Sequence, residues 1–508
     1  MSECMFLGVD VGTEGTRASI YDSEGKLCAK ADHPLTTYRP RYNWIEHDAR
    51  EWWLAACHAI KECISKAPSP GFVKAVSVCG TSGTIVPIGD HGEPLRPAIL
   101  YSDTRATQQA EDLSRDSEIK ELGRSQSSKM DASGGLAKIL WICQNEPEVF
   151  GKTFKFLSTT DYIVLRLSGR VCCDYFNAAK TSLNLLTKQW ARGTLERFGI
   201  PIRLLPDLKE PGTAIGEVTE LAAKQTGLKE GTMVVAGATD GIAGFIASGA
   251  VEPGQACEVT GTTQVFHVTS DKLTPDPMGR IYYHVHPKPS CWIAGGASSG
   301  GGIILRWFHD NVSPHISFEK LDEEAENIEP LSGGLICEAA MTGERAPRWD
   351  PYVSGMLIGL TPKTTSAHIY RGMMEGVAFL LKAIIDVCHE LKIPVNELRS
   401  AGGGAKSRIW RQIKADVLGR EIVVPEDPSS TLGVAMLASI GAGVHRDIFE
   451  AARNMVKISE VTKPDLSKTR IYEEGFDICK SCYSALRNSK IYERLAELRM
   501  RAQDQPIQ

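Results

Sequence analysis

Two β-rich segments, each interrupted by a glycine-threonine pair, open the two halves of the chain. In residues 7–21 a β-rich run enters a turn that begins at Gly12, and a second run leaves it; residues 256–266 repeat this pattern around Gly261. Such a pattern predicts an antiparallel hairpin in each half. Glycine lets backbone N–H groups approach a ligand and threonine adds a hydroxyl donor. The turns therefore suit phosphate oxygens, with two ordinary hairpins as the simpler alternative.

The rest of the first half alternates strand and helix patterns. A third strand is predicted over Leu27–Ala31, and Asp48–Glu51 has the pattern of a capping box before apolar residues in helical spacing. Val73–Cys79 is an apolar run of strand length that ends at Gly80. Three strands, a helix and a further strand predict a mixed sheet covered by helices, which is an α/β domain.

The second half repeats this plan. Strands are predicted between residues 256 and 294, and a long helix follows whose apolar face runs from Ile369 to Leu391. The sequence therefore predicts two similar α/β lobes, which are residues 1–248 and 249–508.

Composition is that of an ordinary globular protein, because 42% of the 508 residues are hydrophobic and 23% are charged, with a formal net charge of −5. Basic and acidic residues are mixed along the chain, so no basic block points to nucleic acid. No apolar run reaches the ~20 residues of a membrane span, and the first residues lack a signal-peptide pattern. The 14 cysteines are scattered like free thiols, and the lone pair Cys479 and Cys482 fits one helix better than a zinc site. We expect a cytoplasmic protein that binds neither nucleic acid nor membrane.

Asp240 is the first candidate for acid–base chemistry. It is the only charged residue in the small and apolar stretch 234–244. Burial in such a stretch disfavours the charged carboxylate and makes it more basic, as suits a base that accepts a proton from an attacking alcohol. Asp240 could also cap a helix that starts at Gly241, and the two roles are compatible.

Asp10 and Arg17 flank the first glycine-threonine turn. A carboxylate beside bound polyphosphate is suited to hold Mg²⁺, directly or through water. The guanidinium of Arg17 could bind phosphate oxygens in a bidentate manner, with a solvent-facing strand arginine as the alternative.

Two glycine-rich segments do not fit the common nucleotide motifs. Residues 295–302 follow a predicted strand and precede a helix, but no clean βαβ unit with a ribose-binding acid follows. Residues 402–407 are similar to a P-loop, except that Ala405 stands where that motif requires glycine. Both segments still suit close approach of backbone to a nucleotide at a helix N-terminus, the second helix being predicted from Ser407 to Gly419.

Taken together, seven motifs in order make the chain resemble the FGGY carbohydrate kinases of the actin, sugar kinase and Hsp70 superfold, over nearly its full length. The matching segments are Asp10–Arg17, Trp44–Asp48, Ser102–Arg105, Gly237–Asp240, Gly261–Thr263, Gly343–Asp350 and Gly402–Asp416. The resemblance implies two actin-like (ribonuclease H-like) lobes with a nucleotide cleft between them. It also implies ATP- and Mg²⁺-dependent phosphorylation of a sugar or polyol hydroxyl. Whether the chain forms a homodimer is left open.

The resemblance assigns roles to individual positions. Asp240 matches the general base, and the first lobe is implied to bind sugar and phosphate while the second binds nucleotide. The positions that match are Gly12, Thr13 and Arg17 for the first phosphate loop, Gly261 and Thr262 for the second, Gly302 and Arg306 near the nucleotide, Gly403, Gly404 and Ser407 for the adenosine loop, and Thr81, Ser82, Asp103 and Arg105 for the sugar-facing region.

The sugar-facing region departs from the well-known subfamilies. Xylulokinases typically have Met-His and glycerol kinases Arg-Glu where this chain has Thr81-Ser82, and Tyr101 replaces a usual tryptophan. A small hydroxyl pair leaves more room and looks like the variant in a divergent xylulokinase/ribulokinase-like branch. We predict a kinase for the terminal hydroxyl of a ketose, with a pentulose (xylulose or ribulose) favoured. The alternatives are a hexulose, a tetritol or a linear signalling sugar as substrate, an inactive sugar sensor, and an actin- or Hsp70-like nucleotide switch.

Overall fold

The computed structural model describes residues 4–68, 71, 73–127 and 130–503. The chain divides into two compact units, which we treat one at a time. The first unit comprises Met1–Glu252, Asp271–Ile293 and Asp427–Lys457, and the second comprises Pro253–Ser270, Ala294–Glu426 and Ile458–Gln508. No helix in the described part of the chain is long and apolar enough to span a membrane.

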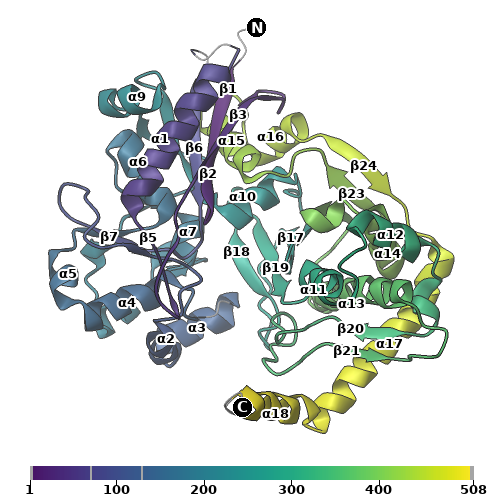
Figure 1. Ribbon diagram of the computed structural model, residues 1–508. Coiled ribbons are helices and arrows are strands. Elements are labelled where there is room, and N and C mark those ends of the chain that lie inside the picture. Colours follow the sequence, from purple (N-terminus) through teal and green to yellow (C-terminus); the bar gives the residue numbers. More distant parts are fainter. Residues whose placement is uncertain (1–3, 69–70, 72, 128–129, 504–508) are drawn as a thin grey trace. The chain divides into compact units, whose positions relative to one another are not determined.

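The first unit is built on a mixed sheet with the strand order β14-β15-β6-β1-β2-β3 (Figure 1). Its strands are β1 (Met5–Val11), β2 (Gly15–Asp22), β3 (Leu27–Pro34), β6 (Val73–Gly80), β14 (Ala214–Glu217) and β15 (Met233–Thr239). β1 pairs antiparallel with β2, so the first predicted hairpin is confirmed, and β1 and β15 both pair parallel with β6. The three parallel strands therefore end at the same edge of the sheet.

Side-chain alternation along β1 explains how both faces of this sheet are covered. Leu7, Val9 and Val11 belong to the core that includes α1 (Ala49–Lys66) and α6 (Thr159–Ser168), both of which lie alongside the strands in Figure 1. Gly8 points to the other face, where a Cβ atom would lie 1.9 Å from the carbonyl oxygen of Thr431. Glycine at this position lets α15 (Ser430–Gly441) pack directly on β1.

The position of α15 bears on the predicted domains. Because α15 packs on β1, β6 and β15, residues 427–457 belong to the compact first unit, as do residues 271–293. The division into 1–248 and 249–508 stays a prediction. The compact units are defined by contacts in space and are not continuous in sequence, so they do not test that division.

The start of α1 differs in detail from the predicted capping box. Asp48 caps the helix and accepts a hydrogen bond from the Arg50 N–H at 2.9 Å. The Glu51 carboxylate instead accepts a hydrogen bond from the hydroxyl of Tyr38 at 2.7 Å. The predicted start of the helix is therefore correct, but Glu51 hydrogen-bonds to Tyr38 of a neighbouring strand instead of completing a capping box.

A largely helical region of the first unit, between residues 85 and 205, has a core of its own. Its elements are β7 (Val86–Ile88), β8 (Ala98–Ile99), α2 (Thr107–Ser114), α3 (Ser117–Gln126), α4 (Gly135–Asn145), α5 (Pro147–Lys152), β9 (Lys155–Leu157) and α8 (Arg192–Arg197). The remaining elements of the unit are β4 (Tyr38–Arg41), β5 (Trp44–His47), β10 (Cys172–Asp174), α7 (Tyr175–Ala179), β11 (Leu183–Asn184), β12 (Gln189–Trp190), β13 (Asp207–Lys209), α9 (Glu220–Thr226), α10 (Asp240–Ala247), β18 (Tyr282–Val285) and α16 (Ile448–Met455).

The second unit has a sheet in which β19, β17, β16, β22, β23 and β24 follow one another. Their bounds are β16 (Gln255–Thr260), β17 (Gln264–Ser270), β19 (Trp292–Ser298), β22 (Glu397–Ala401), β23 (Ile422–Pro425) and β24 (Ile458–Thr462). β16 pairs antiparallel with β17, which confirms the second predicted hairpin, and parallel with β22. The α/β prediction thus holds in both units.

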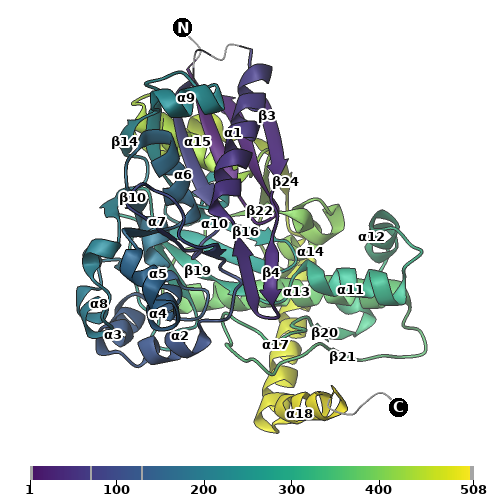
Figure 2. The same cartoon turned by 60° about the vertical axis from the view of Figure 1, so that its left-hand side comes forward.

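Helices pack around this sheet to form the core of the second unit. They are α11 (Gly302–Val312), α12 (Phe318–Glu326), α13 (Ser366–Glu390), α14 (Arg408–Leu418), α17 (Leu466–Asn488) and α18 (Ile491–Gln503). Figure 2 shows α17 passing the antiparallel pair of short strands β20 (Ile336–Glu338) and β21 (Met356–Ile358). The helix predicted after the glycine run is α14, with Ser407 as its N-cap.

Candidate functional site

Asp10, Thr81 and Asp240 gather at one edge of the first sheet. Asp10 lies near the end of β1, Thr81 follows β6, and Asp240 is the first residue of α10 after β15. Because these three strands are parallel and adjacent, their carboxyl ends meet there. This edge of an open α/β sheet is where ligands commonly bind.

Asp240 has the electrostatic setting expected of a base. One carboxylate oxygen accepts a hydrogen bond from the Gly241 N–H at 2.7 Å. Burial and, next, the negative charge of Asp10 raise the pKa of Asp240 to about 6, while Lys180 acts in the opposite direction. The N-cap of α10 is Thr239, so Asp240 is not the capping residue that the alternative interpretation requires.

Asp10 is a buried carboxylate with one oxygen satisfied and one not. Its Oδ2 atom accepts hydrogen bonds from the Ser430 hydroxyl at 2.7 Å and from Arg17 at 3.4 Å. Its Oδ1 atom is buried and accepts no hydrogen bond from an N–H or O–H group of the described residues, and the Cys79 thiol beside the carboxylate is only a weak donor. Burial raises the pKa of Asp10. An unpartnered carboxylate oxygen fits a cation such as Mg²⁺, which takes one or two carboxylates and keeps several waters.

A cage made of protein side chains alone is not present around Asp10. No three His, Cys, Asp or Glu side chains of the described residues gather as metal ligands. Asp10 could therefore hold Mg²⁺ only together with water or with phosphate oxygens.

The predicted sugar-facing pair, Thr81 and Ser82, divides into a buried and an accessible residue. The Thr81 hydroxyl lies 2.8 Å from that of Thr84 and 3.2 Å from that of Thr159, and Thr81 is 4% exposed. Ser82 is half-buried, and its hydroxyl makes no hydrogen bond within the described part of the chain. Of the two hydroxyls, that of Ser82 is free for a ligand.

Lys138 supports this turn and was not found from the sequence. Its fully buried ammonium donates to the carbonyl oxygens of Gly83 at 3.1 Å, Ala132 at 3.0 Å and Ser133 at 2.6 Å. Burial lowers the pKa of Lys138 to about 7. The signal in the sequence was a single lysine in an otherwise apolar helix start, GLAKILWI.

The structure gives Asp103 and Arg105 a different setting from the one expected for sugar contacts. Asp103 is fully buried and accepts hydrogen bonds from the Ile45 N–H and from both Nε and Nη2 of Arg105. Arg105 also pairs with Glu46 at 2.8 Å and lies over the ring of Trp44, 3.7 Å from its centroid. Most polar atoms of the two side chains are therefore bound to protein groups, but Nη1 of Arg105 is buried without a hydrogen-bond partner among the described residues. The two residues are placed to hold the surrounding segments, and their contact with a sugar stays a prediction.

The first predicted phosphate turn is closed by a backbone hydrogen bond and leaves the Arg17 side chain accessible. Gly12 donates its N–H to the carbonyl oxygen of Gly15 at 3.0 Å, which closes the β1–β2 turn. Thr13 accepts a hydrogen bond at its backbone oxygen from the Thr37 hydroxyl. The Arg17 side chain is 63% exposed, so its guanidinium is available to an anion.

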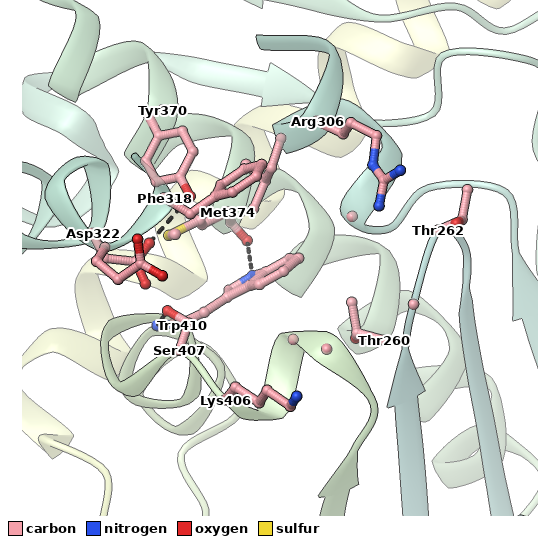
Figure 3. Close-up of a pocket in the computed structure, with 16 residues that line it drawn as sticks. Thr260, Thr262, Arg306, Phe318, Asp322, Tyr370, Met374, Lys406, Ser407 and Trp410 are labelled. Carbon is pink, nitrogen blue, oxygen red and sulfur yellow. Dashed lines mark hydrogen bonds between the residues drawn. The ribbon is translucent and has the colours of Figure 1, made fainter. Parts of the chain in front are cut away.

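A cavity of about 590 Å³ in the second unit brings the other predicted positions together (Figure 3). It is lined by every nucleotide-binding position predicted in the second half, namely Gly261, Thr262, Gly302, Arg306, Gly403, Gly404 and Ser407. The Gly302 N–H donates to the carbonyl oxygen of Gly261 at 2.7 Å, so the second turn lies against the start of α11. Backbone N–H groups at a helix start suit phosphate oxygens.

The opposite end of the cavity is apolar, and sequence reasoning missed it. Phe318, Tyr370, Met374 and Trp410 line it together with Leu305. Figure 3 shows Tyr370, Phe318 and Met374 on the side away from Thr262. The indole N–H of Trp410 donates to the carbonyl oxygen of Met374 at 3.1 Å. A flat aromatic ring fits between such walls. These residues come from four separate helices, so no local motif marked them.

The chain matches family models along most of its length. The model of the N-terminal domain of the FGGY family of carbohydrate kinases matches residues 5–247, and that of the C-terminal domain matches residues 257–442.

Individual relatives agree with these matches. Xylulose kinase of Bacillus subtilis (strain 168) is 28% identical over 481 residues, covering 94% of this chain and 96% of the relative. Gluconokinase of the same organism is 28% identical over 463 residues, covering 89% and 90%. Among solved structures, that of xylulose kinase from Rhodospirillum rubrum has a TM-score of 0.89 and 26% identity, covering 96% of this chain and 100% of its own.

Proposed function

The chain belongs to the FGGY family of carbohydrate kinases, and from this premise we propose that it transfers the γ-phosphoryl group of ATP to the terminal hydroxyl of a pentulose, xylulose or ribulose. The observation that carries the proposal is that two carboxylates, Asp240 and Asp10, lie within electrostatic range of each other at the carboxyl edge of the first sheet. Similarity to xylulose kinases over 94% of the chain supports the choice of a ketose. A kinase acts where ATP is supplied, and we propose a cytoplasmic location.

Asp240 acts as the general base in this proposal. With a pKa raised to about 6, its carboxylate is ionised at neutral pH and is more basic than an ordinary aspartate. It accepts the proton of the attacking sugar hydroxyl as the bond to phosphorus forms. A positioned general base contributes about 10²–10⁴-fold to the rate of such a step.

Asp10 supplies the protein ligand for Mg²⁺. Its buried, unpartnered Oδ1 atom fits that ion, and the Ser430 hydroxyl holds the other oxygen in place. When bound, Mg²⁺ neutralises charge on the phosphate oxygens of ATP. Arg17 lies at the same turn and offers its exposed guanidinium to phosphate.

The groups near Asp240 carry charges of both signs. Lys180 lies within electrostatic range of Asp131 and Asp240, and Asp10 adds a further negative charge. Arg17 pairs with Asp10 and Lys138 lies near Asp131, so charges of both signs surround the site and do not by themselves select the sugar. Ser82 offers a neutral hydroxyl to the sugar, while Lys138, Asp103 and Arg105 position the surrounding segments.

The second unit binds the nucleotide. The glycine-rich end of its cavity is suited to the phosphates, and the apolar end to the adenine ring. The same division is proposed for the predicted domains, with sugar and phosphate binding in 1–248 and nucleotide binding in 249–508.

A substrate panel tests the proposal. The purified chain is assayed for ADP release with ATP, Mg²⁺ and D-xylulose, D-ribulose, a hexulose, erythritol, glycerol or D-gluconate. We expect kcat/KM for a pentulose to exceed that for gluconate by at least about tenfold, because a neutral hydroxyl such as that of Ser82 pairs with a sugar hydroxyl, and a polar group left unpaired costs about 1–3 kcal/mol. ³¹P NMR of the product identifies the phosphorylated hydroxyl. Gluconate as the best substrate would contradict the choice of sugar, and sugar binding without ADP release would indicate a sensor.

A further inference from the structure

A buried ion pair lies directly behind the nucleotide cavity of the second unit. Lys414 of α14 and Glu258 of β16 are both fully buried, and their Nζ and Oε1 atoms are 2.6 Å apart. Ser400 of β22 also donates its hydroxyl to Oε1 of Glu258. The Lys414 ammonium lies 4.9 Å from the ring centroid of Trp410, which forms a wall of the cavity.

Thr260 connects this ion pair to the cavity. Its hydroxyl donates to Oε2 of Glu258 at 2.6 Å and accepts from Nζ of Lys414 at 3.0 Å and from Nε2 of Gln264 at 3.1 Å. A hydroxyl has one donor and two acceptor positions, so every position is occupied. Thr260 lines the cavity, yet its hydroxyl is committed to the buried groups and not to a ligand.

The other atoms of Thr260 contact the glycine loop. A Cβ atom on Gly402 would lie 2.7 Å from the carbonyl oxygen of Thr260, and one on Gly404 would lie 2.8 Å from its methyl carbon. The residue after Thr260 is Gly261, which begins the second phosphate turn. Thr260 therefore sets the spacing between that turn and the loop at 402–404, and Figure 3 shows it on the cavity wall between Thr262 and Lys406.

We propose that Glu258 and Lys414 are positioning residues for the nucleotide, acting through Thr260. Burying an ion pair is costly, and apolar residues of similar size often stabilise a fold at least as well. A pair with defined hydrogen-bond directions, however, fixes one rotamer of Thr260 and hence one spacing of the two glycine loops. The pair thereby prepares the cavity before the phosphates bind. This inference rests on the proposed nucleotide site.

Calorimetric titration with ADP tests the inference in the full-length chain. Thr260→Val keeps the shape of the side chain but removes the hydroxyl, and the double variant Glu258→Gln/Lys414→Met removes both charges. We expect the Kd for ADP to rise at least about fivefold in Thr260→Val and about tenfold in the double variant, as for loss of positioning hydrogen bonds. The KM for ATP should rise in parallel, while the KM for the sugar stays within about twofold. Thr260→Ser, which keeps the hydroxyl, should retain most of the affinity.

A second buried pair in the same unit serves as the matched control. Arg348 and Glu338 form an ion pair, and neither residue lines the cavity. Glu338→Gln/Arg348→Met should lower thermal stability with the Kd for ADP unchanged. Wild-type ADP affinity in folded Thr260→Val and Glu258→Gln/Lys414→Met would overturn the inference. So would failure of both to fold, because the trio would then serve stability alone. Absence of ADP binding by the wild-type chain would instead contradict the nucleotide site itself.

Discussion

The Asp10 carboxylate accepts a hydrogen bond of 2.7 Å from the hydroxyl of Ser430, although 420 positions separate the two residues in the sequence. The contact joins the end of β1 to the first residue of α15, within the first unit. It satisfies one oxygen of Asp10 and orients the carboxylate, so that the other oxygen is left buried and unpartnered. The proposed metal ligand is thus prepared by a residue from the far end of the chain.

Replacement of Asp10 should weaken the response to Mg²⁺. Asp10→Asn removes the negative charge that the ion requires, so we expect lower kcat and a Mg²⁺ concentration for half-maximal activity that rises at least about tenfold. Ser430→Ala should cause a smaller rise in the same direction, because it removes only the orienting hydrogen bond. Activity measured against Mg²⁺ concentration gives the result. An unchanged titration in Asp10→Asn would place the metal ligand elsewhere.

The two hydroxyls of the sugar-facing turn should have separable effects. Ser82→Ala removes the accessible hydroxyl, so kcat/KM for the best pentulose should fall about tenfold while the KM for ATP is unchanged. Thr81→Val instead leaves Thr84 and Thr159 with fewer partners, and should lower the free energy of unfolding by about 1–3 kcal/mol. Steady-state kinetics and denaturant unfolding distinguish the two. Equal loss of activity on every sugar in Ser82→Ala would show that this turn only shapes the site.

Asp322 should set the preference for the nucleotide base. It lines the apolar end of the cavity and accepts a hydrogen bond from the Tyr370 hydroxyl at 3.1 Å. A carboxylate there can accept from the 6-amino group of adenine but is repelled by the 6-oxo group of hypoxanthine. Wild type should prefer ATP over ITP at least about tenfold, and Asp322→Ala should reduce this preference to about threefold or less. Glu323→Ala, which removes an exposed carboxylate of the same helix that does not line the cavity, is the control. Equal use of ATP and ITP by the wild type would contradict this role.

Local patterns in the sequence were sufficient for the hairpins, the glycine turns and the desolvated setting of Asp240. Each of these features depends on residues that lie within a few positions of one another in the sequence, so local backbone preferences are enough to predict it. The apolar end of the cavity was not predictable in this way, because Phe318, Tyr370 and Trp410 are spread over separate helices. The settings of Asp103 and Lys138 were missed for a related reason: a motif gives the residue type, but only packing shows that a charge is already satisfied.

The base function of Asp240 should reduce the stability of the fold. Its pKa is raised from 3.8 to about 6, a difference that corresponds to ~3 kcal/mol. The folded state then binds more protons than the unfolded state between pH 4 and 6, so the destabilisation is complete above pH 6 and disappears as the pH falls to 4. Asp240→Asn should therefore raise the free energy of unfolding at pH 7.5 by up to ~3 kcal/mol, and by much less at pH 4. Denaturant unfolding of both proteins at the two pH values measures this, and a pH-independent difference would contradict it.

The central claim is that Asp240 accepts the proton of the sugar hydroxyl, and the kinetics of Asp240→Asn and Asp240→Ala test it most directly. Turnover of the best pentulose should fall by about 10²–10⁴-fold in both variants. The Kd for ADP should stay within about twofold of wild type, because Asp240 acts on the acceptor and not on the nucleotide. In the wild type, kcat/KM for the sugar should fall as the pH drops through about 6, the pKa of Asp240 in the free enzyme. A variant that folds, binds ADP normally and keeps more than about a tenth of the wild-type turnover would contradict the account.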